Sequence, residues 1–139
     1  RISAVLFTHS HADHILGIDD LRAFNFVQKQ SIPCYGTAQT FADIRQMFSY
    51  VFRQNPLYAG GGVPQMTLHE IDGVTPFEVE GVLVQPIPLL HGRLPVTGFR
   101  FGELAYLTDT NCIPEETACA SRITTHTSRS LSQLRFLSR

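Results

Sequence analysis

The most constraining feature of the sequence is a stretch of six residues that contains four side chains of metal-ligating type: His9, His11, Asp13 and His14. Two histidines spaced two apart project to the same side of an extended segment, and the next two residues follow where the chain is expected to turn into a helix. Imidazole nitrogen and carboxylate oxygen suit Zn²⁺ and tolerate Mn²⁺ or Fe²⁺. The stretch therefore predicts a metal site, with a histidine-rich polar turn as the alternative.

The residues on either side of this stretch favour the metal site. The apolar run within residues 2–7 predicts a buried strand that leads into it. Asp13 is also placed to cap the helix that follows, and a carboxylate has enough lone pairs to serve a backbone amide and an ion together. Helical spacing over residues 15–29 predicts a core-facing stripe made of Ile15, Ile18, Leu21, Phe24 and Val27.

The rest of the chain predicts a layered domain of helices and strands. A strand over 32–36 is followed by a helix over 38–53, which Thr37 caps and which packs its Phe41, Ile44, Phe48 and Val51 face on the core. From Met66 onward the pattern is that of strands, expected over 66–71, 76–79, 82–90, 97–101 and 104–108. A βα unit followed by a run of strands indicates an α/β fold.

The segment 55–65, between these two parts, is rich in glycine and proline and is expected to be a loop. Three consecutive glycines occur there, but neither a preceding strand nor a following Lys-Ser/Thr pair completes a phosphate-binding loop. A rim or lid is the favoured interpretation.

Two further ligand-type residues stand where expected strands end. The strand over 82–90 is followed by His91, and the strand over 104–108 is followed by Asp109. Taken alone, each has a plain structural explanation, because aspartate often begins a turn and a histidine can end a strand. Beside the ligand-type stretch at 9–14, both are expected to be ligands.

Two other histidines are not assigned to the metal site. His69 lies within an expected strand and has no ligand-type neighbour at useful spacing. His126 lies in a segment that shows no sign of the rigid support that a metal ligand needs.

Composition limits the class of protein. A chain of 139 residues forms one domain at most, and it contains no run of 18 apolar residues that would predict a transmembrane helix. Its net charge of −1 gives no electrostatic reason to expect nucleic acid or an anionic membrane as a partner. Three irregularly spaced cysteines argue against a disulfide framework and favour a reducing, cytoplasmic compartment.

The C-terminal segment 117–139 differs from the rest of the chain. It holds four arginines and no acidic residue, whereas residues 1–116 hold all 12 acidic residues and seven basic ones. A basic tail that binds a partner is one interpretation. The favoured interpretation is a tail that does not belong to the domain's natural sequence, which makes residues 1–116 the domain.

These motifs resemble those of the metallo-β-lactamase fold superfamily. The superfamily signature His-x-His-x-Asp-His is matched by residues 9–14, the next histidine by His91, and the bridging aspartate by Asp109. The resemblance covers residues 2–116. It extends more narrowly to the phosphoribosyl cyclic phosphodiesterase group, which is associated with phosphonate breakdown, in three segments at 14–22, 35–37 and 91–101.

The resemblance implies a partial αβ/βα sandwich, truncated at its N-terminus and ending in the aberrant tail. It also implies two divalent metal ions, Zn²⁺ in first place and Mn²⁺ in second. One ion would be bound by His9, His11 and His91, the second by Asp13 and His14, and Asp109 would lie between the two. The superfamily has a further histidine ligand downstream of this aspartate, which the sequence lacks.

The implied activity is hydrolysis of phosphodiesters, small cyclic ones in particular, by a metal-bridging hydroxide. Asp13 and Asp109 would orient this hydroxide, and Thr8, Thr108 and Thr110 are candidate partners of the ligands. The partner would be a small-molecule substrate, and a homodimer is left open.

Four alternatives remain at this stage. An RNA-processing nuclease of the superfamily would need a basic surface, whereas residues 1–116 are acidic on balance. A β-lactamase is disfavoured by Asp109 at the bridging position. A mononuclear iron oxygenase shares the fold, and an inactive fragment would bind one metal ion through His9, His11 and His91.

Overall fold

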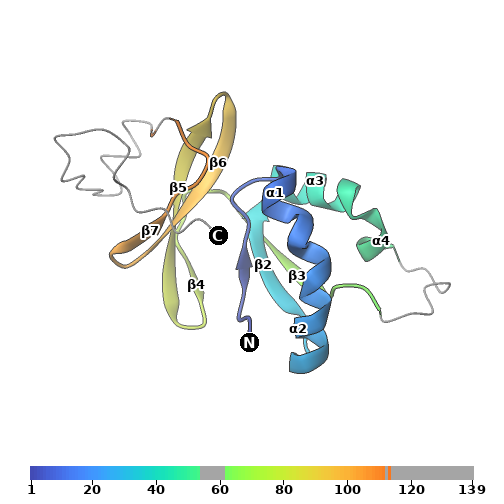
Figure 1. The fold of residues 1–139 in the computed structure, drawn as a ribbon. Helices are drawn as coiled ribbons and strands as arrows, with labels where there is room; N and C mark the ends of the chain where they lie inside the picture. Colours follow the sequence, from blue (N-terminus) through green and yellow to red (C-terminus); the bar gives the residue numbers. More distant parts are fainter. Residues whose placement is uncertain (54–61, 112, 114–139) are drawn as a thin grey trace.

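The computed structural model describes residues 1–53, 62–111 and 113, and these residues form three layers (Figure 1). An antiparallel sheet faces a parallel sheet, and helices cover the other face of the parallel sheet. This arrangement confirms the expected α/β class and its sheet-on-sheet, helix-on-sheet layering.

The parallel sheet contains β1 (Val5–Leu6), β2 (Ile32–Thr37) and β3 (Met66–Ile71), in that order. Parallel neighbours cannot be joined by a hairpin, so each connection crosses over through helices. Strand β2 lies in the middle and alternates buried and half-buried residues along its length. The first strand is shorter than the expected 2–7 because only two of its residues pair with β2.

Two helical connections cover this sheet. The first contains α1 (Ala12–Ile15), a 3₁₀ segment (Leu16–Asp20) and α2 (Leu21–Gln28), and the second contains α3 (Ala38–Met47) and α4 (Ser49–Phe52). The expected cap is confirmed, since the Thr37 hydroxyl accepts a hydrogen bond from the Thr40 backbone amide at 3.3 Å. The core beneath them includes Phe7, Ile15, Ile18, Ile32, Phe41, Ile44 and Phe48.

The expected helix over 15–29 is partly wrong. Its first three stripe residues are buried, but Phe24 is 38% exposed and Val27 is 78% exposed. The 3₁₀ segment has three residues per turn instead of 3.6, so the phase of the stripe changes before α2 begins. In α2 the buried positions are Leu21, as expected, and Asn25, which takes the place of Phe24 and Val27.

Asn25 shows why a polar residue takes this buried position. Its amide donates hydrogen bonds to the backbone carbonyls of Gln30 and Gln65, both at 2.9 Å, and its carbonyl accepts one from the Gln65 amide. Both polar groups of the Asn25 side chain are thus hydrogen-bonded, which removes the penalty for burying an amide. The residue thereby ties the end of α2 to the segment that leads into β3.

The antiparallel sheet is a meander of β4 (Phe77–Val79), β5 (Val82–His91), β6 (Leu94–Phe101) and β7 (Leu104–Tyr106). These bounds lie close to the predicted strands. Gly98 in β6 lies where a side chain has no room, because a Cβ there would lie 2.6 Å from a methyl group of Leu107. The close approach lets Leu107 pack into a small core with Ile87, Leu89 and Val96.

Two direct links join the sheets. The Thr97 amide of β6 donates a hydrogen bond to the Thr8 carbonyl, at the end of β1, at 2.9 Å. Farther along, the Tyr35 ring lies between two other rings, stacked on His69 at 4.8 Å and on Phe77 of β4 at 4.8 Å. His69 therefore has a packing role, in agreement with its exclusion from the metal site.

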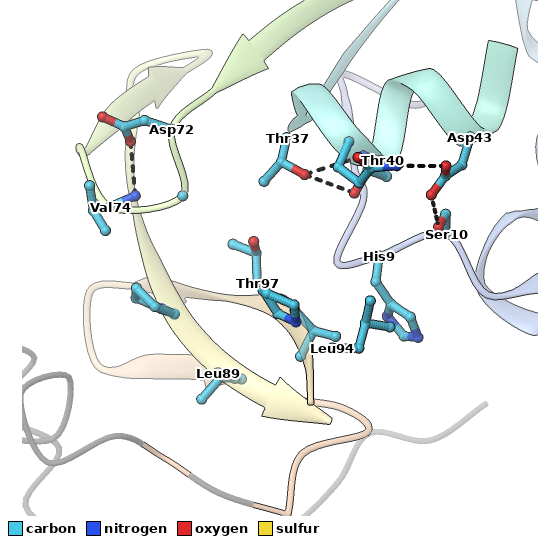
Figure 2. A pocket seen from close by; sticks show the side chains of 15 residues that line it. His9, Ser10, Thr37, Thr40, Asp43, Asp72, Val74, Leu89, Leu94 and Thr97 are labelled. Carbon is cyan, nitrogen blue, oxygen red and sulfur yellow. Dashed lines mark hydrogen bonds between the residues drawn. The ribbon is translucent and has the colours of Figure 1, made fainter. Parts of the chain in front are cut away.

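A cavity of about 340 Å³ lies between these layers (Figure 2). One wall comes from Ser10 and the first turns of α3, including Asp43, and the opposite wall from β5 and β6. The segment around Asp72, between β3 and β4, closes a third side. The cavity reaches His9, the first residue of the predicted metal site.

Several expectations fall outside the described residues. They concern most of the loop at 55–65, and the tail 117–139 with His126, so the domain boundary at 116 stays a prediction.

Cys34 is buried in β2 as a free thiol. Among the described helices, none has the length and apolar character needed to cross a membrane.

Candidate metal centre

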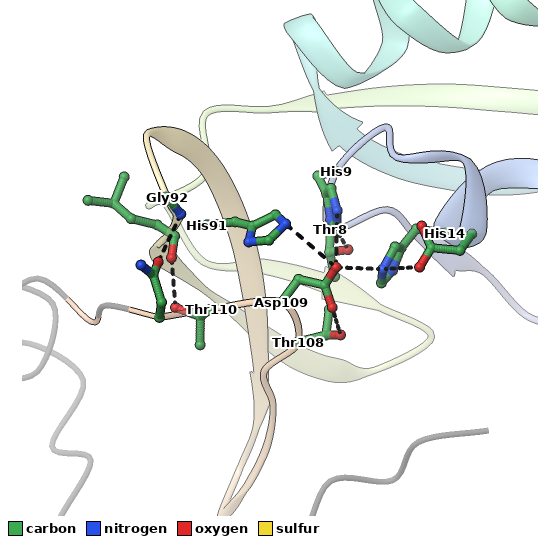
Figure 3. Close-up of polar contacts among 11 residues, drawn as sticks. Thr8, His9, His14, His91, Gly92, Thr108, Asp109 and Thr110 are labelled. Carbon is green, nitrogen blue, oxygen red and sulfur yellow. Dashed lines mark hydrogen bonds and ion pairs between the residues drawn. The ribbon is translucent and has the colours of Figure 1, made fainter.

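The structure brings together ligand-type side chains from three separate segments (Figure 3). His9, His11 and His14 come from the loop after β1 and from the α1 helix that follows it. His91 is the last residue of β5, and Asp109 follows β7. The first three are neighbours in sequence, whereas the last two reach the cluster only because the two sheets face each other.

Asp109 is the shared member of this cluster. Its Oδ2 atom lies 3.2 Å from the Nε2 atom of His14, 3.8 Å from that of His9 and 4.0 Å from that of His91. Two groups of ligand atoms have members that all lie within 4.8 Å of one another. We call His9, His14 and Asp109 the buried triad, and His11, His91 and Asp109 the exposed triad.

The two triads divide the histidines differently from the division implied by the resemblance, which pairs His9 with His11 and His91. In the structure, the ring of His9 is nearest to that of His14, at 4.3 Å, and the ring of His11 is 4.6 Å away. All four imidazoles are close enough to share two ions, so the assignment of each ligand to one ion stays a prediction.

His9 has the environment expected of a metal ligand. Its side chain is 3% exposed, and its buried Nε2 atom has no hydrogen-bond partner among the described residues. Its Nδ1 atom lies 3.0 Å from the Thr8 hydroxyl, which fixes the ring and leaves Nε2 facing the cluster. A buried polar atom without a partner is costly, and a cation bound there would remove that cost.

The protonation state of His9 agrees with this role. Burial, followed by the neighbouring His14 and His11, lowers its pKa to about 4, against the opposing effect of Asp109. The imidazole is therefore neutral at neutral pH. A neutral imidazole is the form that binds a metal ion.

Asp109 is prepared as an anion. Burial acts to raise its pKa, but the hydrogen bond from the Thr108 hydroxyl, at 3.1 Å, and the adjacent His14 outweigh it, so the pKa lies below the ordinary value. The backbone of Asp109 is left-handed, with φ of 51°. Aspartate is one of the few non-glycine residues that tolerate this conformation, and the resulting turn directs the carboxylate into the cluster.

Asp13 is less well integrated than the other predicted ligands. Its side chain is 79% exposed, and its Oδ2 atom lies 3.5 Å from Nε2 of His14, outside both triads. The expectation that it caps the first helix is wrong, because His11 occupies the N-cap position and no side chain caps the helix there. Asp13 therefore lies at the solvent-exposed edge of the cluster, beside His14.

The predicted supporting threonines have different roles. Thr8 contacts His9 and Thr108 contacts Asp109, whereas the Thr110 hydroxyl donates to the Leu90 carbonyl beside His91. The three residues are thus placed around the cluster, two at ligands and one at the strand end that carries a ligand. This arrangement would stiffen the site.

A contact between Ser10, within the ligand loop, and Asp43 of α3 has no signal in the sequence. Ser10, between His9 and His11, donates a hydrogen bond from its hydroxyl to Asp43 of α3 at 2.5 Å (Figure 2). The two residues are separated by 33 positions, so no local pattern connects them.

The donor set fits divalent ions. Four imidazoles and one shared carboxylate are nitrogen and oxygen ligands of the kind that bind Zn²⁺ or Mn²⁺, and the buried unpaired Nε2 of His9 faces them. A carboxylate common to both triads is also the arrangement that lets one residue contact two ions.

Comparisons with known proteins agree with this geometry. Residues 1–124 match the sequence family described as the Beta-lactamase superfamily domain. An octanoyltransferase from Porphyromonas gingivalis (strain ATCC BAA-308 / W83) is 40% identical over 115 residues, which make up 83% of this chain and 22% of that protein.

Solved structures give the same picture. A diphosphatase from the PhnP family is 33% identical, with a TM-score of 0.72 over 86% of this chain and 43% of that chain. The short form of human tRNase Z is 22% identical, with a TM-score of 0.58 over 86% of this chain and 53% of that chain, a likeness that shows the fold alone. The chain thus spans about half or less of these proteins.

Proposed function

The chain belongs to the metallo-β-lactamase superfamily, and from this premise we propose that it is a metal-dependent hydrolase of small phosphodiesters. The resemblance found in the sequence is confirmed, and the PhnP-family diphosphatase supports its narrower form. The observation that carries the proposal is the convergence of four imidazoles on the Asp109 carboxylate, with a buried Nε2 atom of His9 that has no other partner.

Six residues would hold two divalent ions: His9, His11, Asp13, His14, His91 and Asp109. When bound, such a pair of ions activates water for attack on phosphorus and neutralises charge on the phosphoryl oxygens. Zn²⁺ is the first candidate and Mn²⁺ the second, because the histidine-rich set favours zinc while the carboxylates accept manganese.

The chain's own residues prepare the site for this chemistry. Thr8 holds His9 by its Nδ1 atom, and Thr108 holds Asp109 by its Oδ1 atom, so that His9 Nε2 and Asp109 Oδ2 face the cluster. Asp109 remains ionised because of its lowered pKa. Asp13, whose exposed side chain lies beside His14, would orient the attacking water together with Asp109.

The cavity beside His9 supports a small organic substrate. It measures about 340 Å³, and none of the residues that line it is a lysine or an arginine. A phosphoryl group would therefore be bound at the metal centre, and the cavity would accept an uncharged, hydroxyl-bearing part of the substrate. A nucleic-acid substrate would instead call for a row of cationic side chains.

A second candidate activity is hydrolysis of a diphosphate. It is favoured by the name of the PhnP-family diphosphatase, which is 33% identical to this chain. The same metal centre would serve both reactions, because each needs attack of water at phosphorus. The two differ in the leaving group.

An acyl transfer is not favoured by the described residues. The octanoyltransferase shares only 22% of its length with this chain, so the activity in its name need not belong to the shared part. The described free cysteine, Cys34, is buried, and burial raises its pKa to about 12, which keeps the thiol protonated and a poor nucleophile.

The test is metal analysis together with hydrolysis of bis(p-nitrophenyl) phosphate and of a diphosphate ester. We expect two Zn²⁺ or Mn²⁺ per chain, hydrolysis that stops on chelation and returns on addition of the metal, and unchanged hydrolysis in a Glu78→Gln control, which changes an exposed carboxylate of β4 away from the cavity. One iron per chain would indicate an oxygenase. A single zinc with no hydrolysis would indicate the inactive fragment and contradict the proposal.

A further inference from the structure

The loop that carries the first ligand residues is held on both of its sides. On one side, the Thr8 carbonyl accepts a hydrogen bond from the Thr97 amide of β6. On the other side, the Ser10 hydroxyl donates to Oδ2 of Asp43 in α3. His9 lies between these two attachments, and His11 follows the second one directly.

The attachment at Asp43 is itself supported. Oδ1 of Asp43 accepts a hydrogen bond from the Gln39 amide, one turn earlier in α3, at 2.9 Å. Both carboxylate oxygens are therefore occupied, which fixes the orientation of the group. Figure 2 shows Asp43 pointing from α3 to Ser10 across the edge of the cavity.

His11 has little else to orient it. It is exposed and occupies the N-cap position of α1, and its side chain makes no capping hydrogen bond. The ring lies 5.3 Å from the ring of His91, its partner in the exposed triad. Apart from its edge contacts with the rings of His9 and His91, the placement of the His11 ring thus depends on the backbone at residues 10 and 11, which the Ser10 to Asp43 hydrogen bond holds.

We propose that Asp43 is a positioning residue for the metal centre: through Ser10 it holds the turn between His9 and His11, so that His11 meets His91 and Asp109. The inference rests on the proposed metal centre but not on the identity of the substrate. An exposed ligand without other support gains most from such a contact, because an ion is bound well only when its ligands are already in place.

The test uses the whole chain loaded with Zn²⁺ or Co²⁺. In Asp43→Ala and in Ser10→Ala, we expect the weaker-bound ion to lose about 10-fold in affinity in a competition titration, and the visible spectrum of the Co²⁺ protein to change. The double variant should lose no more than either single variant, because both changes remove the same contact.

Three further variants separate positioning from other effects. Gln39→Ala removes the other hydrogen bond of Asp43 and leaves the Ser10 contact, so it should change metal affinity and the spectrum less than Asp43→Ala does. Asp72→Asn removes a negative charge from the same cavity without touching the loop, and should also leave affinity unchanged. Ser10→Thr keeps the hydroxyl and should restore metal affinity.

Three results would overturn the inference. The first is an Asp43→Ala protein that is less stable but has unchanged affinity and spectrum, which is a purely structural role. The second is an equal loss in Asp72→Asn, which is an effect of charge alone. The third is additive loss in the double variant. A chain that binds metal as expected but hydrolyses nothing would contradict the proposed function and leave this inference standing.

Discussion

The buried and exposed triads share Asp109 but differ in how far their histidine side chains are exposed to solvent. In the buried triad, the side chain of His9 is 3% exposed and that of His14 is 17% exposed. In the exposed triad, His11 faces solvent and the His91 side chain is 40% exposed. The difference teaches that one centre can combine a desolvated ligand group, suited to holding an ion, with an open one, suited to meeting a substrate.

The two triads also differ in how they are supported. His9 is held through its ring nitrogen by Thr8, whereas the ring of His11 has no hydrogen bond among the described residues and its backbone is held beside Ser10. We therefore expect the buried triad to bind its ion more tightly. Four predictions test this contrast.

The largest effect is expected at Asp109, because this residue belongs to both triads. Asp109→Asn removes the charge shared by both triads, and asparagine tolerates the same left-handed backbone. We expect both ions to bind weakly and hydrolysis to fall by more than about 1,000-fold, as when an essential catalytic group is removed. Metal analysis and kinetics measure this. Retained activity would remove Asp109 from the set of ligands.

The second effect concerns pH and is expected at His9 of the buried triad. His9 has a pKa of about 4 in the folded, metal-free chain and about 6.5 when unfolded, so below pH 6.5 the unfolded chain binds the proton more readily. The free energy of unfolding should therefore fall as pH drops from 6.5 to 4, by up to about 3 kcal/mol. Urea unfolding at several pH values measures it.

The control for this pH dependence is His9→Gln, which cannot titrate and should flatten the curve between pH 6.5 and 4. If the curve of His9→Gln keeps its slope, another group causes the loss of stability.

The third effect compares the triads directly through metal-linked stability. A ligand present at 100 times its dissociation constant stabilises the folded state by about 2.7 kcal/mol. At a zinc concentration that saturates only the tighter site, His9→Ala should lose most of this gain, and His11→Ala should keep most of it. Thermal unfolding with zinc and with chelator measures the gain, and equal losses would refute the contrast.

The smallest effect is expected at Thr8. Thr8→Val keeps the shape of the side chain but removes the hydroxyl 3.0 Å from Nδ1 of His9. Because partners of metal ligands typically contribute about 10-fold or more, we expect about a 10-fold loss of zinc affinity in the buried triad. Thr67→Val, at an exposed threonine of β3 whose hydroxyl contacts Ser31, is the matched control. An unchanged affinity would show that the ring needs no such support.

Most of the residues that make up the site could be predicted from the sequence. The ligand stretch at 9–14 and the ends of the β5 and β7 strands are local patterns, and the structure brings them together as expected. The Thr37 cap is equally local, because its partner is three residues away.

The parts that could not be predicted depend on contacts between distant segments. The contact from Ser10 to Asp43 spans 33 positions, and the burial of Asn25 depends on a partner 40 positions away. The exposure of Val27 follows from the 3₁₀ segment before α2, which a search for a 3.6-residue period does not detect. The unequal burial of the two triads likewise follows from how the sheets meet.

The left-handed backbone at Asp109 has a consequence for how this position can change over time. A replacement there must suit both a positive φ, which most side chains resist, and a cluster of four imidazoles that calls for an anion. Asparagine and glycine meet the first demand, and glutamate meets only the second. None of these three residues meets both demands, so we expect substitutions of Asp109 to be tolerated poorly.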